Sequence, residues 1–359
     1  MDIGRLALAG AGGLAVIAGL FVLTGRKPGE AARYARRIAG TMLLAFGLAT
    51  LLLVGLLLAA GLAPWLLPTY YLYLLNLILI NIILALGLNV LTGNSGQISL
   101  CHSSFMAIGA YTYTLLNNQL HWPMLLCVLG AVSLASLGGV LVGYPARRLS
   151  GIYLALATLA FLSLTQILIE EFPDLTGGIR GLKIEPSEFL IWSMGNETLL
   201  FYIVAIASAF CLYMTANMMR SRIGRAFDAI RTSPHAAQAL GIQVAQVKLI
   251  AFTISAAYAG LAGALFSMVV GFIDPVEFGV SASLRYITFI VVGGMGSIAG
   301  SVIGAVVFTG LPEALRGIKE YGDLVYSAIL LLSLIFMPNG LVGLFRARKR
   351  KSDSSTVGH

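Results

Sequence analysis

The sequence predicts an all-α fold, a polytopic bundle of about ten transmembrane helices with one broken or re-entrant segment. Of its 359 residues, 58% are hydrophobic and 11% are charged, whereas a typical soluble domain has about 25% charged residues. The hydrophobic residues form runs of about 20, the length that crosses a ~30 Å hydrocarbon core. One run contains a glycine cluster that would interrupt a helix. So few charges cannot cover a water-exposed surface, which excludes a soluble protein or a nucleic-acid-binding domain of this length.

The hydrophobic runs define the candidate spans and three regions of the chain. The spans cover approximately residues 6–23, 38–63, 70–91, 103–118, 124–143, 151–169, 199–217, 248–271, 284–310 and 323–337. The first run resembles a signal-peptide core, but no small-residue cleavage site precedes Arg26, so we interpret it as a helix. The regions are an N-terminal extension with two spans and a basic loop (1–65), a core (66–345) and a basic tail (346–359).

The basic residues predict the orientation in the membrane. Seventeen of the 23 lie in four short segments, which are Arg26–Arg37, Arg147–Arg148, Arg220–Lys248 and Arg346–Lys351. Basic loops stay in the cytoplasm, which places the N-terminus outside and the acidic loops 170–198 and 272–283 outside as well. The tail then reaches the cytoplasm only if one segment does not cross. We expect this to be 284–310, where Gly293-Gly294-Met295-Gly296-Ser297 would break the helix.

A second glycine-rich interruption, Thr92–Gln97, lies about 200 residues earlier, in the other half of the chain. Interruptions in both halves are typical of transporters with an internal repeat. Small residues also recur at helical spacing, at Gly296, Gly300 and Gly304 and again at Ala256, Gly260 and Ala264. Such stripes favour close helix packing in a membrane.

Catalytic and coupling chemistry is not visible in the sequence. It contains no GxxxxGK[ST] phosphate loop, HExxH metal motif or GxSxG nucleophile, and we expect no catalytic residues, no metal site and no cofactor. The three cysteines have no paired spacing and are interpreted as small hydrophobic residues. Ionisable residues, the usual markers of ion coupling, are almost absent from the spans; His102 is expected near a membrane edge. The protein either conducts passively or is driven by a partner.

The cytoplasmic loop at about 218–247 contains a short helix with its own caps. Ser233 is a good N-cap, Pro234 suits the first helical position, and Gly241 suits the position after the helix end. The predicted helix has about two turns, roughly 10 Å, and is too short to be stable alone. Its small face, with Ala236 and Ala237, would fit a groove on a partner. The alternative, an amphipathic helix on the lipid surface, lacks the bulky apolar face such helices use.

This loop, Gly224 to Gly241 followed by Ala251–Gly260, closely resembles the signature of the branched-chain amino acid ABC transporter permeases, in particular the high-affinity "M" subunit family. Permeases of urea and short amides are close relatives of that family. The resemblance extends from about residue 70 to 345 and includes Gly87–Gly93, Gly96–Leu100, Gly109–Tyr111, Gly151–Leu159, Leu175–Gly178, Gly293–Ser297 and Pro338–Leu341. Two departures are Cys101-His102, where the family has Gly-His, and Ile179-Arg180 after the Thr-Gly-Gly motif.

The resemblance implies a multi-pass subunit of the bacterial inner membrane, with a periplasmic N-terminus and a cytoplasmic C-terminus. Its partners would be the lipid bilayer, a second homologous permease, two cytoplasmic ATPase subunits that hold ATP and Mg²⁺, and a periplasmic binding protein. The short helix would seat in a cleft of an ATPase subunit. The residues that carry this coupling would be Gly224, Arg225, Ala229, Arg231, Ser233, Pro234, Ala236, Ala237 and Gly241.

The leading hypothesis is import of leucine, isoleucine or valine by alternating access. Helix N-termini at the two glycine breaks could hold the substrate carboxylate. The candidate path residues are Asn89, Asn94, Gln97, Ser99, His102, Gly293, Gly294 and Gly296. The alternatives are a urea or short-amide permease and, from other classes, a passive channel or an intramembrane enzyme. A channel does not need a capped cytoplasmic helix, and an enzyme would need catalytic groups that the sequence does not show.

Overall fold

The computed structural model describes residues 68–185 and 197–314. The first half contains α3 (Thr69–Leu88), its π-helical continuation η1 (Asn89–Asn94), α4 (His102–Leu120), α5 (Met124–Ala146), α6 (Ile152–Glu171), α7 (Pro173–Thr176), the 3-10 turn η2 (Gly178–Arg180) and β1 (Leu182–Lys183). The second half contains α9 (Glu197–Arg220), α10 (Arg222–Thr232), α11 (Pro234–Ala239), α12 (Val244–Val270), β2 (Phe272–Ile273), the 3-10 turn η3 (Pro275–Phe278), α13 (Val280–Gly293) and α14 (Ile298–Ala314). The predicted spans 6–23, 38–63 and 323–337 and the basic tail lie outside the described residues.

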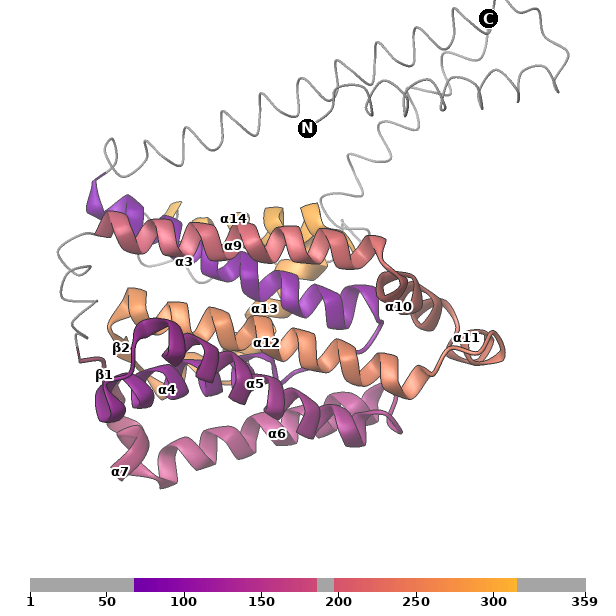
Figure 1. Ribbon diagram of the computed structural model, residues 1–359, viewed down its shortest axis with the longest axis horizontal. Helices are drawn as coiled ribbons and strands as arrows, with labels where there is room; N and C mark the ends of the chain where they lie inside the picture. The colour runs from indigo at the N-terminus through magenta and orange to yellow at the C-terminus, as the bar shows by residue number, and fades with distance from the viewer. Residues whose placement is uncertain (1–67, 186–196, 315–359) are drawn as a thin grey trace, which may run out of the picture. The chain divides into compact units, whose positions relative to one another are not determined.

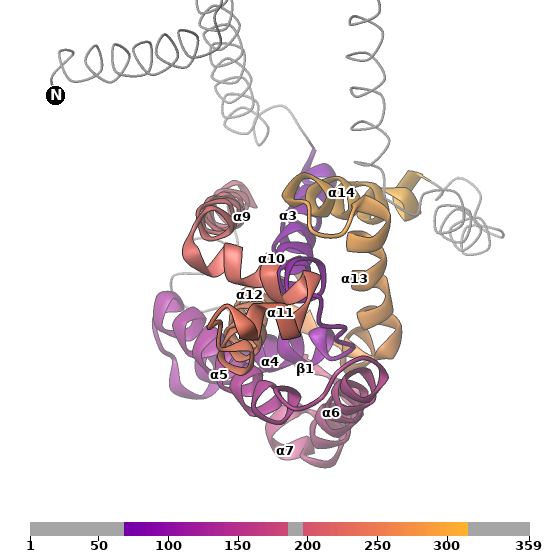
Figure 2. The ribbon, with the colours of Figure 1, turned by 90° about the vertical axis from the view of Figure 1, so that its right-hand side faces the viewer.

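The helices confirm an all-helical membrane fold. Five are long and apolar enough to cross a bilayer: Thr69–Asn94, α5, α6, α9 and α12. Each predicted span between 70 and 271 corresponds to one helix, α4 included. Of the five, α3 with η1 and α12 are the most buried, and other helices surround them in Figure 2. The predicted total of about ten spans stays a prediction, because three of them are not described.

The segment expected to be broken is a helical hairpin. Helix α13 ends at Gly293 and α14 begins at Ile298. Gly293 lies against Gly300, and Gly304 lies against the backbone of Phe289, so the two helices run antiparallel. A helix of 14 residues is about 21 Å long and cannot cross a ~30 Å core. The interruption predicted from the glycines is confirmed, but Gly296 lies in the turn rather than on a helix face.

The first half also contains a helix that begins inside the bundle. After η1 ends at Asn94, the chain turns back, and His102 at the start of α4 contacts Leu84 of α3. Leu84 lies ten residues before Asn94, which is about 15 Å along the helix. The expectation that His102 lies near a membrane edge is therefore wrong: the imidazole is fully buried between α3 and α12.

The two ends of the bundle differ in structure and charge. Helices α10 and α11 lie at one end, and β1, β2 and α7 lie at the other (Figure 1). At the second end β1 and β2 pair antiparallel, with Leu182 opposite Ile273. The first end contains Arg147, Arg148, Arg220, Arg222, Arg225, Arg231 and Lys248, with Asp228; the second contains Glu170, Glu171, Asp174, Glu185, Glu197, Asp274 and Glu277, with Arg180, Lys183 and Arg285. The basic side chains thus gather beside the short helix, as the sequence predicts.

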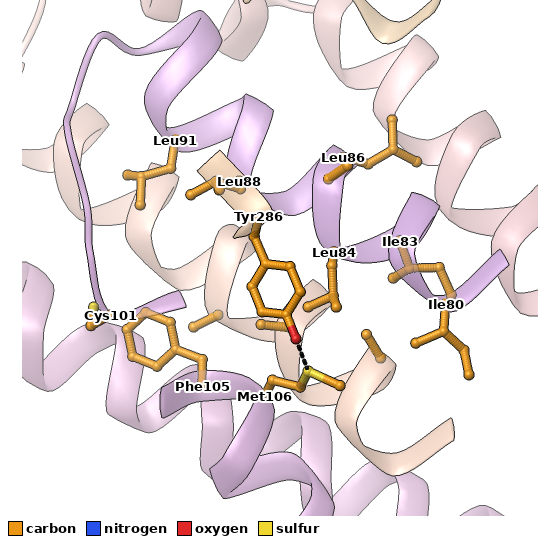
Figure 3. Close-up of a cluster of buried hydrophobic side chains, with 14 of the residues drawn as sticks. Ile80, Ile83, Leu84, Leu86, Leu88, Leu91, Cys101, Phe105, Met106 and Tyr286 are labelled. Carbon is orange, nitrogen blue, oxygen red and sulfur yellow. Dashed lines mark hydrogen bonds between the residues drawn. The ribbon is translucent and has the colours of Figure 1, made fainter. Parts of the chain in front are cut away.

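A hydrophobic core lies between α3, α4, α12 and α13. Figure 3 shows Ile83, Leu84 and Phe105 around the ring of Tyr286, whose hydroxyl lies 3.2 Å from the sulfur of Met106. The three cysteines of the described residues are buried and unpaired. This agrees with their interpretation as small hydrophobic residues.

Glycines allow α12 to approach its neighbours at backbone distance. A Cβ atom at Gly109 of α4 would lie 2.6 Å from the Cα of Gly260, and one at Gly263 would collide with the Met106 carbonyl. A Cβ atom at Gly260 would collide with Ala135 of α5. The small stripe predicted on α12 is therefore used for helix packing, as expected where hydrophobicity gives no net drive for association.

We predict that Gly260→Val destabilises the protein by about 1–3 kcal/mol or more, because the added side chain must separate α12 from α5. The matched control is Gly310→Val in α14, where an added Cβ meets no atom within 4 Å. Thermal unfolding of the purified protein in detergent measures both. Equal melting temperatures for the two variants would contradict the packing described here.

Candidate functional site

The two glycine breaks, far apart in sequence, meet at the basic end of the bundle. The Asn89 side-chain oxygen accepts a hydrogen bond from the backbone N–H of Gly296 at 2.8 Å, and its Nδ2 donates to the Ser297 carbonyl at 3.3 Å. A Cβ atom at Gly93 would lie 2.6 Å from the Gly296 nitrogen, so only glycine fits there. We name residues 93–97 and 293–297, joined by Asn89, the glycine junction.

The glycine junction is also connected to α12. The Ser95 hydroxyl donates to the Leu91 carbonyl at 2.6 Å, and the Gln97 amide donates to Ser95 Oγ at 2.8 Å. The same amide lies 3.5 Å from the carbonyl of Lys248 near the start of α12. The junction therefore joins three elements through buried polar groups: η1, the α13–α14 turn and α12.

Two helix C-termini end at the glycine junction, those of η1 and α13. Helix C-termini carry partial negative charge. Helix α14 begins there too, but the Ser297 hydroxyl already accepts a hydrogen bond from its Gly300 N–H at 3.3 Å. This arrangement favours a cation, so it does not support the expectation that N-termini at these breaks hold a carboxylate.

The helix N-terminus that does lie inside the bundle belongs to α4. His102 Nε2 lies 3.0 Å from the Leu84 carbonyl, and Nδ1 lies 3.3 Å from the Ser255 hydroxyl. Because a carbonyl can only accept, Nε2 carries the hydrogen and a neutral ring satisfies both contacts. His102 therefore joins α3, α4 and α12 and has no ring nitrogen left for a ligand.

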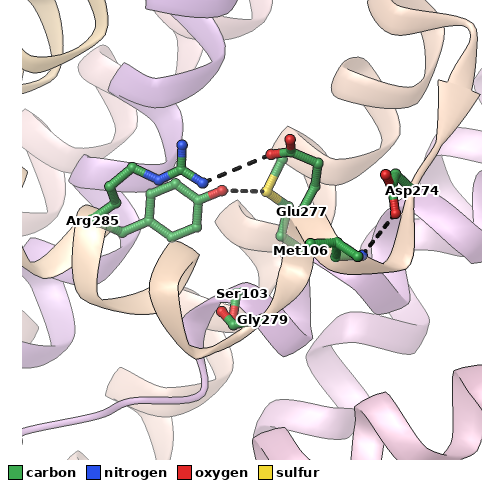
Figure 4. A network of polar contacts seen from close by, with 8 residues as sticks. Ser103, Met106, Asp274, Glu277, Gly279 and Arg285 are labelled. Carbon is green, nitrogen blue, oxygen red and sulfur yellow. Dashed lines mark hydrogen bonds and ion pairs between the residues drawn. The ribbon is translucent and has the colours of Figure 1, made fainter. Parts of the chain in front are cut away.

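The start of α4 also contacts the segment that leads into α13. Ser103 Oγ donates to the Gly279 carbonyl at 3.3 Å, and Arg285 forms an ion pair with Glu277 at 3.8 Å (Figure 4). In the same segment, Asp274 caps η3 by accepting from Val276 N–H at 2.9 Å. The Ser103 hydrogen bond joins α4 to this segment, and the other two contacts lie within residues 274–285; the sequence analysis did not identify them.

The polar residues proposed for the path differ in how well they are satisfied. Asn89, Asn94, Gln97, Ser99 and His102 are all buried. Ser99 lies 3.4 Å from the Cys101 sulfur, and Asn89 and His102 are bonded within the chain. In contrast, Asn94 Oδ1 and Gln97 Oε1 have no hydrogen-bond partner among the described residues. These two oxygens are therefore the members of the set that are free to bind a substrate ammonium group or a water molecule.

The capped helix has the form that the sequence predicts. In α11, Ser233 Oγ accepts from the Ala236 N–H at 3.3 Å, and Pro234 is the first residue. The helix ends at Ala239, and Gly241 follows in the left-handed region at φ 82°. Helix α10 before it is capped by Ser221 and buries Phe227 and Ile230.

The proposed coupling residues divide into a buried and an exposed group. Ala237 is buried against this chain, and Gly224 packs on the Met219 backbone, so neither is open to a partner. The exposed members are Arg225, Arg231, Pro234, Ala236 and Gly241. Ala229 and Ser233 are partly buried. Leu240 was not among the predicted residues, but it is the most exposed large hydrophobic residue of this segment at 81%. The open face of α11 therefore includes Ala236 and Leu240 rather than Ala237.

We predict that Asn89→Leu lowers stability by about 1–3 kcal/mol, because it leaves the partly buried Gly296 N–H without its acceptor and removes the hydrogen bond to the Ser297 carbonyl. Asn118→Leu is the matched control: its amide also accepts from a backbone N–H and donates to one carbonyl, but these two hydrogen bonds are exposed, so water can replace them. Thermal unfolding compares them. An equal loss of stability in the Asn118 and Asn89 variants would contradict the predicted role of Asn89 in joining the two breaks.

Sequence comparisons identify the family. Residues 70–334 match the family described as "Branched-chain amino acid transport system / permease component". The chain is 32% identical over 332 residues to the high-affinity branched-chain amino acid permease protein LivM of Escherichia coli K12, covering 86% of this chain and 78% of LivM. It is 31% identical over 284 residues to LivH of Salmonella typhimurium, covering 73% and 90%. No solved structure matches. The chain therefore belongs to the family of branched-chain amino acid transport permeases.

Proposed function

We propose that this chain is a transmembrane permease subunit of an ATP-driven importer that translocates leucine, isoleucine or valine. The observation that carries the proposal is the exposed, self-capped helix α11 on a chain that belongs to this permease family. An exposed short helix with its own caps is what a docking element for a separate motor requires. The relatives are transport subunits rather than enzymes, and ATP with Mg²⁺ is assigned to partner subunits.

The chain acts with a second, homologous permease. Its similarity to both LivM and LivH, at 32% and 31% identity, supports a pair of related subunits. Two cytoplasmic ATPases and a periplasmic binding protein complete the proposed complex. The ATPases would contact α11, and the binding protein would deliver substrate at the opposite end, around β1 and β2.

The protein is a multi-pass membrane protein, and we place it in the bacterial inner membrane with the α10–α11 end in the cytoplasm. The support is the cluster of Arg and Lys side chains at that end. The N-terminus is then periplasmic and the C-terminus cytoplasmic. ATP binding would bring the ATPases together, move α11 with its cleft, and open the permease pair toward the periplasm.

Two alternatives are less well supported. A urea or short-amide permease would share the fold, but the relatives that cover most of this chain transport branched-chain amino acids. A passive channel would not need the capped helix α11. Uptake of labelled leucine, isoleucine and valine, compared with urea, by the reconstituted complex decides between them: ATP-dependent uptake of urea alone would overturn the substrate assignment.

We predict opposite labelling for two cysteine variants. The variants are Leu240→Cys in the α10–α11 segment and Ile179→Cys at the other end of the bundle. The native side chains Leu240 and Ile179 are 81% and 80% exposed. A membrane-impermeant maleimide added to right-side-out vesicles should label position 179 but not 240, and inverted vesicles should reverse this. The native Cys101, Cys127 and Cys211 are buried, which keeps the background low. The opposite pattern would reverse the proposed orientation.

We predict that Ala236→Glu abolishes uptake and the stimulation of ATP hydrolysis, because it adds a bulky charge to the exposed face of α11. The protein should remain in the membrane, since the position is exposed and the helix caps do not change. Ala236→Ser is the control and should transport normally. Undiminished uptake by the glutamate variant would contradict the assignment of α11 as the docking element.

A further inference from the structure

The side chain of Arg231, in the last turn of α10, lies on the glycine junction. A Cβ atom at Gly96 would lie 3.4 Å from Arg231 Cγ and 3.7 Å from its Cβ. A Cβ atom at Gly296 would collide with the guanidinium and lie 3.5 Å from its Cζ. Both glycines have a positive φ, 73° and 77°, a backbone conformation that favours glycine. Arg231, in α10, thus contacts both glycine breaks: the one after η1 and the one between α13 and α14.

The charge of Arg231 suits this position. The C-termini of η1 and α13, with their partial negative charge, end at the junction. Among the described residues, the ion pairs do not include Arg231. Of the other charged groups near this end, Lys248 donates to the Leu149 carbonyl at 3.2 Å, and Arg225 donates to the Arg220 carbonyl at 3.3 Å. The guanidinium of Arg231 can therefore interact with the partial negative charge at the C-termini of η1 and α13.

The rest of α10 is fixed to the bundle by apolar contacts. Phe227 and Ile230 are buried, and α10 contacts η1, α9 and α12. Helix α11 follows α10 after Ser233 alone. Helix α10, which α11 follows, is therefore connected to η1 directly and through Arg231, and to the α13–α14 hairpin through Arg231, while Asn89 joins η1 to that hairpin.

We propose that Arg231 is a positioning residue that fastens the coupling helices to the glycine junction, so that both broken helices move with α11 during transport. The proposal rests on the proposed function and extends it. Arg231 contacts the glycine junction of its own chain, whereas the face of α11 with Ala236 would contact the ATPase. Arg231 is then needed for coupling but not for assembly.

The first test uses the complete reconstituted complex with binding protein. Arg231→Ala should still co-purify with the ATPases and hydrolyse ATP, while leucine uptake per ATP falls about tenfold or more, a coupling loss of common size. Arg222→Ala, the same change on the exposed start of α10, should keep the wild-type ratio. Loss of ATPase binding by the Arg231 variant, or an unchanged ratio, would overturn the proposal.

The second test replaces the arginine contact with a covalent bond. The Cβ positions of residues 96 and 231 are 3.7 Å apart, within the usual range for a disulfide. Reduced Gly96→Cys/Arg231→Cys should be uncoupled, and oxidation should restore uptake per ATP, whereas oxidation of either single variant should not. Failure to form the disulfide would overturn the proposed contact, and inhibition by it would show that the contact must break during transport.

These outcomes are separate from failure of the proposed function. If the wild-type complex does not take up leucine, the substrate assignment fails before any variant is compared. The role of Arg231 is then measured with the substrate that the complex does transport, using the same ratio of uptake to ATP hydrolysis. A purely structural role would lower the folded amount of the variant and not this ratio.

Discussion

The arrangement of this bundle depends on the pair of hydrogen bonds between Asn89 and the turn of the α13–α14 hairpin. These bonds join two helix breaks separated by about 200 residues of sequence. A buried backbone N–H or carbonyl without a partner is costly in a membrane, where water cannot replace it. A broken helix is therefore tolerated only where another element satisfies its free groups. Here the Asn89 side chain supplies the acceptor for the Gly296 N–H, and Gly93 lets the two backbones approach.

The packing around α12 explains why this junction can act as one unit. Gly109, Gly260 and Gly263 bring α4 and α12 into backbone contact, and Ala135 closes the third side. Close-packed helices are rigid on short length scales. Helices α10 and α11 and the glycine junction lie at the basic end of this group, and the start of α4 with His102 lies deeper in the bundle. In the proposed transport cycle a movement at α11 would thus reach the interior through few contacts.

Much of this could be predicted from local patterns. Ser233, Pro234 and Gly241 predicted α11 because caps act within one turn of the chain, and the run at Gly293 predicted a break because glycine weakens a helix wherever it lies. Predictions that needed knowledge of neighbours were less successful. His102 was placed near an edge, since its position along the chain does not reveal that the loop after Asn94 turns back into the bundle. Ala237 was expected on the docking face, yet it packs on its own chain.

By itself, the sequence determined the membrane-spanning helical class, the positions of the helices between residues 70 and 271, both breaks, the capped helix α11 and the family resemblance. These follow from hydrophobicity, spacing and capping, which are local properties. Only the tertiary structure decided that the two breaks meet, that the C-termini of η1 and α13 lie there beside the start of α14, and that Arg231 reaches them. Contacts between residues far apart in the chain depend on how the helices pack, and a single sequence does not specify that through any local pattern.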